Sequence, residues 1–260
     1  MKLAAVTFSP QGLTLCRRLQ AGLAELQIYL HDSVAGVATA HRFSRIMELT
    51  PQLFEAYDGL IFIAPCGVVV RSLAGCPQSK LQDPAVVVAD VGGRHVVSLL
   101  SGHEGGANDL AMRVANLLDA EPVITTTTEA VKDLIVGIGC RKGKESAAIV
   151  AAVRQVLQQH ELAPERVRLL ATAQIKAEEA GLQQAAASLG IPLRIIGHDS
   201  IRGCCRDFQS SEFVNEKIGL PAVAEPAALL AGRRTLLIVR KQALDGITIA
   251  VAQENCTSLG

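Results

Sequence analysis

The 260-residue sequence contains no tryptophan, and aromatic residues make up only 3% of it. Proteins that bind single-stranded nucleic acid usually stack bases on aromatic side chains, so this composition argues against that class. Net charge is also absent, because 25 basic residues balance 25 acidic ones. A neutral chain has no overall field that attracts nucleic acid or an anionic membrane surface. Any anionic ligand must therefore be bound by a local group of cations.

Long apolar segments and paired cysteine motifs are lacking as well. The stretch Ala147–Val153 is too short to cross a bilayer, and the N-terminal segment has neither the length nor the cleavage pattern of a secretory signal. The 7 cysteines include no CxxC pair, which is typical of reduced thiols inside the cell. We therefore expect a soluble cytoplasmic protein that holds no zinc ion.

Short β-branched runs alternate with amphipathic helical stretches along the chain, which is typical of α/β folds. We expect two α/β domains, each with a central sheet flanked by helices, at residues 1–132 and 133–260. The strands expected in the first domain are Leu3–Phe8, Gln27–Leu30, Gly59–Ile63, Ala85–Asp90, His95–Leu99 and Pro122–Ile124. The helices expected there are Gly12–Glu25, Ser44–Ala56, Val68–Leu73 and Gly105–Leu118.

The second domain repeats the alternation of strands and helices. The expected strands are Leu134–Ile138, Val167–Ala171, Pro192–Ile196, Thr235–Val239 and Ile247–Val251. The expected helices are Lys144–His160, Lys176–Leu189, Phe213–Ile218 and Pro226–Ala231. The last two strands are joined through Leu244-Asp245-Gly246, which predicts a hairpin at one edge of the sheet.

A first glycine-rich segment, Ser98–Asp109, lies between an expected strand and an expected helix. The free N–H groups and the dipole at such a helix start favour an anion, and His103 and Glu104 are groups that transfer protons. The segment lacks both the GK[ST] ending of a Walker A loop and the GxGxxG spacing. The alternative is a tight turn in which Asn108 or Asp109 caps the helix and His103 is solvated.

A second glycine-rich segment is Val136–Gly143. Gly137 and Gly139 resemble the first half of a dinucleotide-binding fingerprint, but the third glycine is displaced and no acidic residue follows at the required distance. Arg141 and Lys142 are expected at the start of the next helix, where they would bind carboxylates. The alternative is a tight turn with two solvated cations.

Two smaller features complete the set of candidate sites. Lys176 and Glu179 are three residues apart and can meet on one helix face, although an ordinary surface ion pair explains them equally well. Glu225 precedes Pro226, which fits a first helical position and would place the carboxylate at the helix start. The sequence contains no serine nucleophile elbow and no HExxH motif, which argues against the common serine hydrolases and metalloproteases.

At these segments the sequence resembles the CbiG family, the cobalt-precorrin-5A hydrolases of the anaerobic cobalamin pathway. The resemblance is carried by Val97–His103, Gly105–Asn108, Pro122–Thr126, Val136–Gly143, Ala171–Thr172, Lys176, Glu179, Gly181, Leu182, Val223–Ala228 and Lys241. These segments follow the family's order and extend over almost the whole chain. A middle segment that longer members carry between the two glycine-rich loops is missing here.

The resemblance implies that the protein hydrolyses cobalt-precorrin-5A, opening its lactone and releasing acetaldehyde to give cobalt-precorrin-5B. The cobalt belongs to the substrate, so no metal or other cofactor of the protein is expected. The candidate catalytic residues are His103, Glu104 and Ser101, and which of the first two is the acid or base stays open. The candidate substrate-binding residues are Gly102, Gly105, Gly106, Asn108, Gly137, Gly139, Arg141, Lys142, Lys176, Glu179 and Glu225.

Two other functions compete with hydrolysis. The second half alone resembles CobE, so a non-catalytic protein that binds and hands on a tetrapyrrole is the main alternative. Nucleotide binding is a third interpretation, based only on the glycine-rich turns. The expected partner is a cobalt-bearing tetrapyrrole, with other enzymes of the pathway and a second copy of the chain as further candidates. Nucleic acid and membranes are not expected partners.

Overall fold

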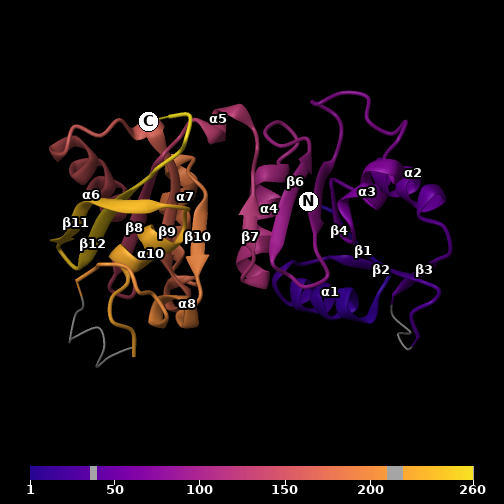
Figure 1. The fold of residues 1–260 in the computed structure, drawn as a ribbon, viewed down its shortest axis with the longest axis horizontal. Coiled ribbons are helices and arrows are strands. Elements are labelled where there is room, and N and C mark those ends of the chain that lie inside the picture. The colour runs from indigo at the N-terminus through magenta and orange to yellow at the C-terminus, as the bar shows by residue number, and fades with distance from the viewer. Residues whose placement is uncertain (36–39, 210–218, 260) are drawn as a thin grey trace. The chain divides into compact units, whose positions relative to one another are not determined.

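A computed structural model describes residues 1–35, 40–209 and 219–259 of the chain. It divides into two compact units, Met1–Thr126 and Thr127–Gly260 (Figure 1). The sequence placed the boundary between Lys132 and Asp133. Each unit has a central β-sheet with helices packed on it, so the predicted α/β class is confirmed.

The first unit contains a seven-stranded sheet in the order β3-β2-β1-β4-β5-β6-β7. Its strands are β1 (Leu3–Thr7), β2 (Gln27–His31), β3 (His41–Phe43), β4 (Gly59–Ile63), β5 (Ala85–Ala89), β6 (His95–Leu100) and β7 (Glu121–Val123). Neighbouring strands are parallel except β5 and β6. Because of that reversal, the carboxyl ends of β6 and β7 lie at the end of the sheet where β1, β4 and β5 begin.

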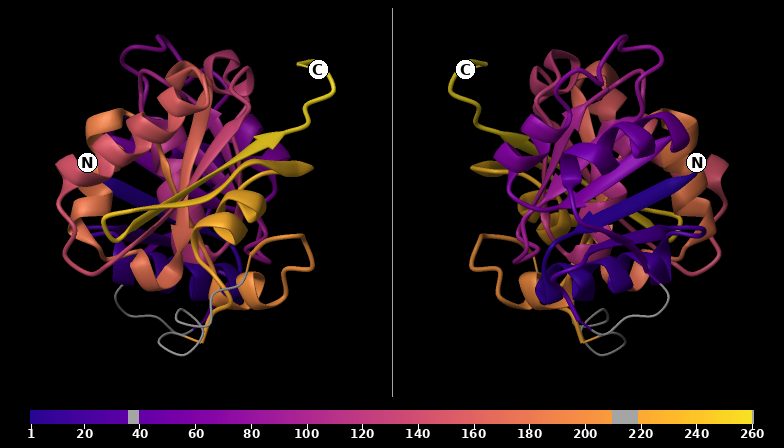
Figure 2. Two further views of the ribbon diagram at one scale, coloured as in Figure 1. Left: turned by 90° about the vertical axis from the view of Figure 1, so that its left-hand side faces the viewer. Right: turned by 90° about the vertical axis from the view of Figure 1, so that its right-hand side faces the viewer.

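Helices cover both faces of this sheet (Figure 2, right). They are α1 (Pro10–Gly22), α2 (Ile46–Ala56), α3 (Cys66–Ser72) and α4 (Ala107–Leu118). Ile61 and Ile63 of β4 belong to the buried cluster that contains α1 and α4, whereas Leu60 and Phe62 belong to the cluster that contains α2 and α3. Successive strand side chains point to opposite faces, so a fully apolar strand such as β4 packs against both layers.

The second unit contains a five-stranded sheet in the order β10-β9-β8-β12-β11. Its strands are β8 (Leu134–Cys140), β9 (Val167–Ala173), β10 (Leu193–Ile196), β11 (Thr235–Leu244) and β12 (Ile247–Glu254). The strands β8, β9 and β10 are parallel, and β12 is antiparallel to both β8 and β11. The predicted hairpin through Asp245 and Gly246 is confirmed, with β11 at the sheet edge (Figure 2, left).

Helices lie on both faces of the second sheet too. They are α5 (Thr127–Ala130), α6 (Ser146–Gln159), α7 (Ala180–Leu189), α8 (His198–Arg202) and α10 (Ala224–Leu230), with 3-10 turns at Pro164–Arg166 and Gln174–Lys176. Val136 and Ile138 share a buried cluster with α6 and α7. Gly137, between them, faces α10, and a Cβ atom there would lie 1.9 Å from the Ala224 carbonyl oxygen. The glycine therefore lets α10 pack directly on the strand.

Most of the predicted elements are confirmed, but the helix expected from Lys176 begins later. Lys176 ends a 3-10 turn, and α7 begins at Ala180 with Glu179 as its N-cap residue. A Cβ atom on Gly181 would lie 1.9 Å from the Lys144 carbonyl oxygen, so this first turn packs closely against the loop after β8. That tertiary contact, which helical spacing does not encode, determines where the helix begins.

Three short elements, β3, α5 and α8, were not predicted. The helix predicted at Phe213–Ile218 lies outside the described residues. Within the described ranges, no helix combines the length and the apolar character needed to span a bilayer.

Asp133 holds the start of β8 in place at the amino end of the second sheet. Its side chain is 8% exposed and accepts two hydrogen bonds from Arg166, at 2.9 Å from Nε and 2.6 Å from Nη2. Gln253 Nε2 donates a further bond of 2.7 Å to the same carboxylate. The bonds from Arg166 lower the pKa of Asp133 below its ordinary value.

Replacing Asp133 with asparagine should reduce the free energy of unfolding by about 2 kcal/mol at neutral pH, because hydrogen bonds to a charged group are lost. The pKa of this carboxyl is lower in the folded than in the unfolded protein. Its contribution to the free energy of unfolding is therefore complete above the unfolded pKa, about 4, and is lost as pH falls through the folded pKa. Denaturant unfolding at several pH values should show the difference from wild type shrinking below about pH 4. Asp245→Asn, in an exposed ion pair with Lys144, is the control and should change little. An Asp133 effect that persists undiminished in acid would contradict this account.

Candidate functional site

The first candidate loop, residues 101–106, connects β6 to α4. Leu100 at the end of β6 pairs with Val86 near the start of β5. The loop therefore lies at the end of the sheet where β1, β4 and β5 begin, opposite to their carboxyl ends. Ligands of parallel α/β sheets usually bind at carboxyl ends of strands, and here the relevant ends are those of β6 and β7 alone.

Ser101 has an unusual backbone and an unsatisfied side chain. Its φ is 59°, in the left-handed region that non-glycine residues rarely adopt. The residue is 8% exposed, and its Oγ atom is buried without a hydrogen-bond partner among the described residues. A Cβ atom on Gly105 would lie 2.4 Å from the Ser101 Cβ, so only glycine fits across the turn. Strained residues and unpaired buried hydroxyls both cost free energy and are concentrated at functional sites.

The start of α4 is partly occupied by the loop itself. The N–H of Ala107 donates to the Ser101 carbonyl at 3.1 Å, and the N–H of Asn108 donates to the Gly102 carbonyl at 2.9 Å. The N-cap residue is Gly106, with φ of 80° and no side-chain cap. The sequence predicted free N–H groups in this first turn, and for these two amides that prediction is wrong. The helix dipole still favours negative charge at this end.

Asn108 connects the two strand ends. Its Oδ1 accepts a hydrogen bond of 2.8 Å from Ser98 Oγ, and its Nδ2 donates one of 3.0 Å to Thr126 Oγ1. A Cβ atom on Gly102 would lie 2.7 Å from Thr126 Cγ2 and 3.0 Å from Asn108 Oδ1, so Gly102 packs under both side chains. The alternative interpretation had Asn108 or Asp109 as the cap of α4, but the N-cap residue is Gly106. The Asn108 side chain instead bonds to Ser98 and Thr126 across the loop.

His103 and Glu104 lie at the outer tip of this loop, and both are exposed. Glu104 Oε1 accepts a bond of 2.9 Å from Lys80 Nζ, and this ammonium group lowers the pKa of Glu104. A carboxyl group with a lowered pKa stays ionised at neutral pH, so it is a poor proton donor. This argues against Glu104 as the proton donor of the site.

Gly137 and Gly139 do not form a ligand-binding turn. Both lie inside β8, where Gly137 pairs with Ala171 and Ala250, and Gly139 pairs with Thr248. The fingerprint interpretation is wrong for these residues, since glycine at 137 serves the packing of α10.

Arg141 and Lys142 follow β8 on an exposed loop, whereas α6 begins at Ser146 with Glu145 as its N-cap. The expectation that they stand at the helix start is therefore wrong. The Arg141 N–H donates to the Gly246 carbonyl at 2.9 Å, which ties this loop to the β11–β12 turn. The Arg141 side chain extends beside Gly246, whose added Cβ would lie 2.9 Å from the Arg141 Cδ.

Lys176 and Glu179 form the predicted ion pair, with 3.1 Å between Nζ and Oε1 and with both side chains 16% exposed. The Glu179 Oε2 also accepts a bond of 3.0 Å from the Gly143 N–H. That backbone bond, followed by the Lys176 ammonium, lowers the pKa of Glu179. Burial raises the pKa of the neighbouring Cys140 thiol. The pair is therefore more than a surface contact, because it fixes the loop after β8 to the start of α7.

Glu225 is fully buried in the first turn of α10. Its two oxygens accept backbone N–H bonds, at 2.8 Å from Lys241 and 2.6 Å from Gln209. Pro226 is the third residue of α10 rather than the first, which corrects the predicted helix start. The contacts of Glu225 are those of a carboxylate that holds the chain together.

The predicted residues thus gather at two places, one in each unit. In the first unit they surround the loop after β6, and in the second they surround the carboxyl ends of β8 and β9. Sequence reasoning missed Lys80, Thr126 and Gly143 as contact residues. Thr126 follows the end of β7, and β7 pairs with β6. The expected neighbourhood of these two strand ends could have marked Thr126 as a contact residue.

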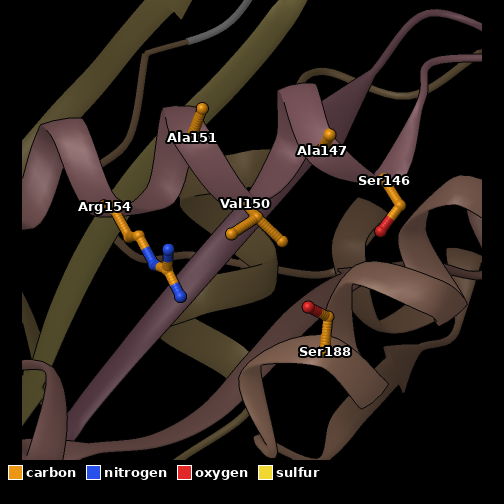
Figure 3. Close-up of a pocket in the computed structure, with 6 residues that line it drawn as sticks. All are labelled: Ser146, Ala147, Val150, Ala151, Arg154 and Ser188. Atoms are coloured by element: carbon orange, nitrogen blue, oxygen red, sulfur yellow. The ribbon is translucent and has the colours of Figure 1, made fainter.

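A pocket of about 490 Å³ opens beside α6 (Figure 3). Its lining residues are Ser146, Ala147, Val150, Ala151, Arg154 and Ser188. No predicted site residue lines this pocket, so it does not mark the candidate site. Within the described parts of the chain, no three His, Cys, Asp or Glu side chains are grouped so as to hold a metal ion.

Comparison with known proteins identifies relatives of both units. Residues 48–129 match the family described as Cobalamin synthesis G N-terminal, and residues 134–252 match Cobalamin synthesis G C-terminus. A cobalt-precorrin-5A hydrolase of Salmonella typhimurium is 26% identical, and the match covers 96% of this chain and 97% of the relative. A cobalt-precorrin-5A hydrolase of Priestia megaterium is 27% identical, covering 78% and 80%. Protein CobE of Sinorhizobium sp is 32% identical, covering 48% of this chain and 83% of the relative.

The Salmonella protein is longer than this chain. The alignment spans 344 positions, whereas the chain has 260 residues, so the relative contains segments that this chain lacks. The resemblance likewise implied that a segment of longer members is missing here.

Proposed function

The chain belongs to the cobalamin synthesis G (CbiG) family, and on that premise we propose that it is a cobalt-precorrin-5A hydrolase. In this reaction the lactone of the tetrapyrrole is opened and acetaldehyde is released, giving cobalt-precorrin-5B. The cobalt is part of the substrate. We place the reaction in the cytoplasm, in keeping with the reduced cysteines that the sequence predicts.

The observation that carries this proposal is the match of both units to the family, over nearly the full length of a relative named as the hydrolase. The CobE match covers only 48% of the chain. A carrier that resembled CobE alone would have no use for the first unit and its loop after β6. The presence of both units therefore favours the enzyme over the carrier.

The chemistry requires a proton-transfer group and donors for developing negative charge. His103 is the group that would activate water for attack on the lactone. The positive end of α4 and the Ser101 hydroxyl would stabilise the negative oxygen that forms during the attack; this hydroxyl is buried without a partner in the part of the chain that the structure describes. Glu104, which is paired with Lys80, would remain a carboxylate throughout.

The substrate bears several carboxylates, which a neutral protein must meet with local cations. In the second unit, Arg141 and Lys142 lie exposed on the loop after β8, which the Gly143 N–H ties to Glu179 of the Lys176–Glu179 pair. A guanidinium binds a carboxylate through two parallel hydrogen bonds, and an ammonium binds it as a point charge. We assign the binding of the ring carboxylates to these cations.

Genetic complementation tests the proposal in a cell that makes the substrate. A strain of Salmonella typhimurium without its own cobalt-precorrin-5A hydrolase would receive this chain, and growth that depends on cobalamin made anaerobically would be scored. We expect the chain to restore growth. Failure to do so by stably expressed protein, in a strain that the native hydrolase restores, would contradict the proposal.

A further inference from the structure

Three side chains, Ser98, Asn108 and Thr126, form a hydrogen-bonded row across the carboxyl ends of β6 and β7. The Ser98 hydroxyl donates to Asn108, and the Asn108 amide donates to Thr126. A hydroxyl group has one proton to donate, and Ser98 uses its proton within the row. Thr126 only accepts in the row, so its proton has no acceptor among the described residues.

This count does not depend on how the Asn108 amide is oriented. With the amide oxygen and nitrogen exchanged, Asn108 would donate to Ser98 and accept from Thr126, and the unused proton would belong to Ser98. In either orientation the row has one hydroxyl proton left for an acceptor outside it. In the structure as it stands, that proton is on Thr126.

The surroundings of Thr126 favour a ligand as that acceptor. Gly102 packs against the Thr126 methyl group, and the hydroxyl of the neighbouring Ser101 is buried without a partner within residues 1–35, 40–209 and 219–259. Thr126 itself is partly exposed, so a bound molecule can reach its oxygen. The hydroxyls of Thr126, which is bonded to Asn108, and of Ser101, whose carbonyl accepts from Ala107, thus each have a proton to donate near the positive end of α4.

We propose that the Thr126 hydroxyl donates a hydrogen bond to an oxygen of the lactone-bearing part of the substrate, and that Ser98 and Asn108 are positioning residues that orient it. This inference depends on the proposed hydrolase function and adds a substrate contact that sequence reasoning did not supply. The row fixes the direction of the Thr126 hydroxyl before substrate binds, which reduces the cost of ordering it.

Two matched pairs of variants isolate the Thr126 hydroxyl. Thr126→Val keeps the side-chain shape and removes the hydroxyl, and Thr126→Ser keeps the hydroxyl and removes the methyl group. Losing one aimed donor should lower kcat/KM for acetaldehyde release about 10- to 100-fold in Thr126→Val, whereas Thr126→Ser should stay within about threefold of wild type. Thr126→Ala compared with Thr126→Ser gives the same test in a background where both lack the methyl group, should Thr126→Val pack poorly.

The positioning role of Ser98 predicts a further effect on kcat/KM. Ser98→Ala should lower kcat/KM less than Thr126→Val does, and the double variant should be no worse than Thr126→Val alone, because both act through one hydrogen bond. The inference is overturned if Thr126→Val equals wild type, or if Thr126→Ser is as impaired as Thr126→Ala. Absence of acetaldehyde with the wild-type protein would instead contradict the proposed function, so the two failures are distinguishable.

Discussion

A Gly137→Ala variant is expected to lose about 3 kcal/mol of stability in the second unit, an effect at the upper end for overpacking. The added Cβ would lie 1.9 Å from the Ala224 carbonyl oxygen and 2.9 Å from the Ala228 Cβ, so it meets both the backbone and a side chain of α10. Because β8 is the central strand and α10 is packed directly on it, neither can move without losing buried contacts elsewhere. The melting temperature of this unit should fall by roughly 10 °C.

Gly139→Ala is the matched control for this prediction, since it adds the same atom to the same strand two residues later. Its Cβ would lie 3.4 Å from the Val223 Cβ, which is ordinary contact, and its cost should stay below about 1 kcal/mol. Both tyrosines, Tyr29 and Tyr57, belong to the first unit, so fluorescence would not report on the second. Scanning calorimetry with hydrogen exchange over residues 134–140 would do so. Equal stability of the two variants would show that α10 is not held on β8 through Gly137.

The second large effect is expected in turnover. Replacing His103 with alanine should lower kcat for acetaldehyde release by about 10²- to 10⁴-fold, the range found when a general acid–base group is removed. The residue is exposed at the tip of its loop, so the fold should not change and the tetrapyrrole should still bind. Turnover, binding and melting temperature measured on the same preparation would separate these effects.

Glu104→Gln is the control for His103. The Glu104 carboxylate is exposed and paired with Lys80, and the hydrogen bond from Lys80 lowers its pKa, so this substitution should reduce kcat by less than about tenfold. If Glu104→Gln abolished turnover while His103→Ala remained active, the assignment would be reversed. Glu104 would then be the base, and Lys80 would be the residue that keeps it ionised.

The sequence predicted the strands and helices well because their signals are local. Continuous apolar runs such as β4 are read directly from residue types, and the β11–β12 turn is marked by Asp245 and Gly246. The start of α7 was mispredicted because close packing of Gly181 on Lys144, a contact between distant residues, decides it. The same holds for Gly137. In the structure this residue must be glycine because α10 packs on it, whereas in the sequence it resembled the glycine of a phosphate-binding turn.

The contacts within the candidate site were much less predictable than the elements around it. The resemblance located the loop after β6, but not that Ser101 is held at positive φ with a buried hydroxyl. The role of Asn108 depends on the register of β6 and β7, which brings Thr126 within hydrogen-bond distance. Neither segment by itself determines which other segment it pairs with, so these contacts could be identified only in the folded structure.

The central claim is that this chain, which lacks segments of a longer relative, is an active hydrolase. Single-turnover incubation of the purified wild-type protein with cobalt-precorrin-5A under anaerobic conditions tests it most directly, with trapped acetaldehyde measured against a sample without protein. We predict one equivalent of acetaldehyde for each equivalent of tetrapyrrole consumed. Tight binding of the tetrapyrrole without acetaldehyde above the background would contradict the claim and would identify the chain as a carrier.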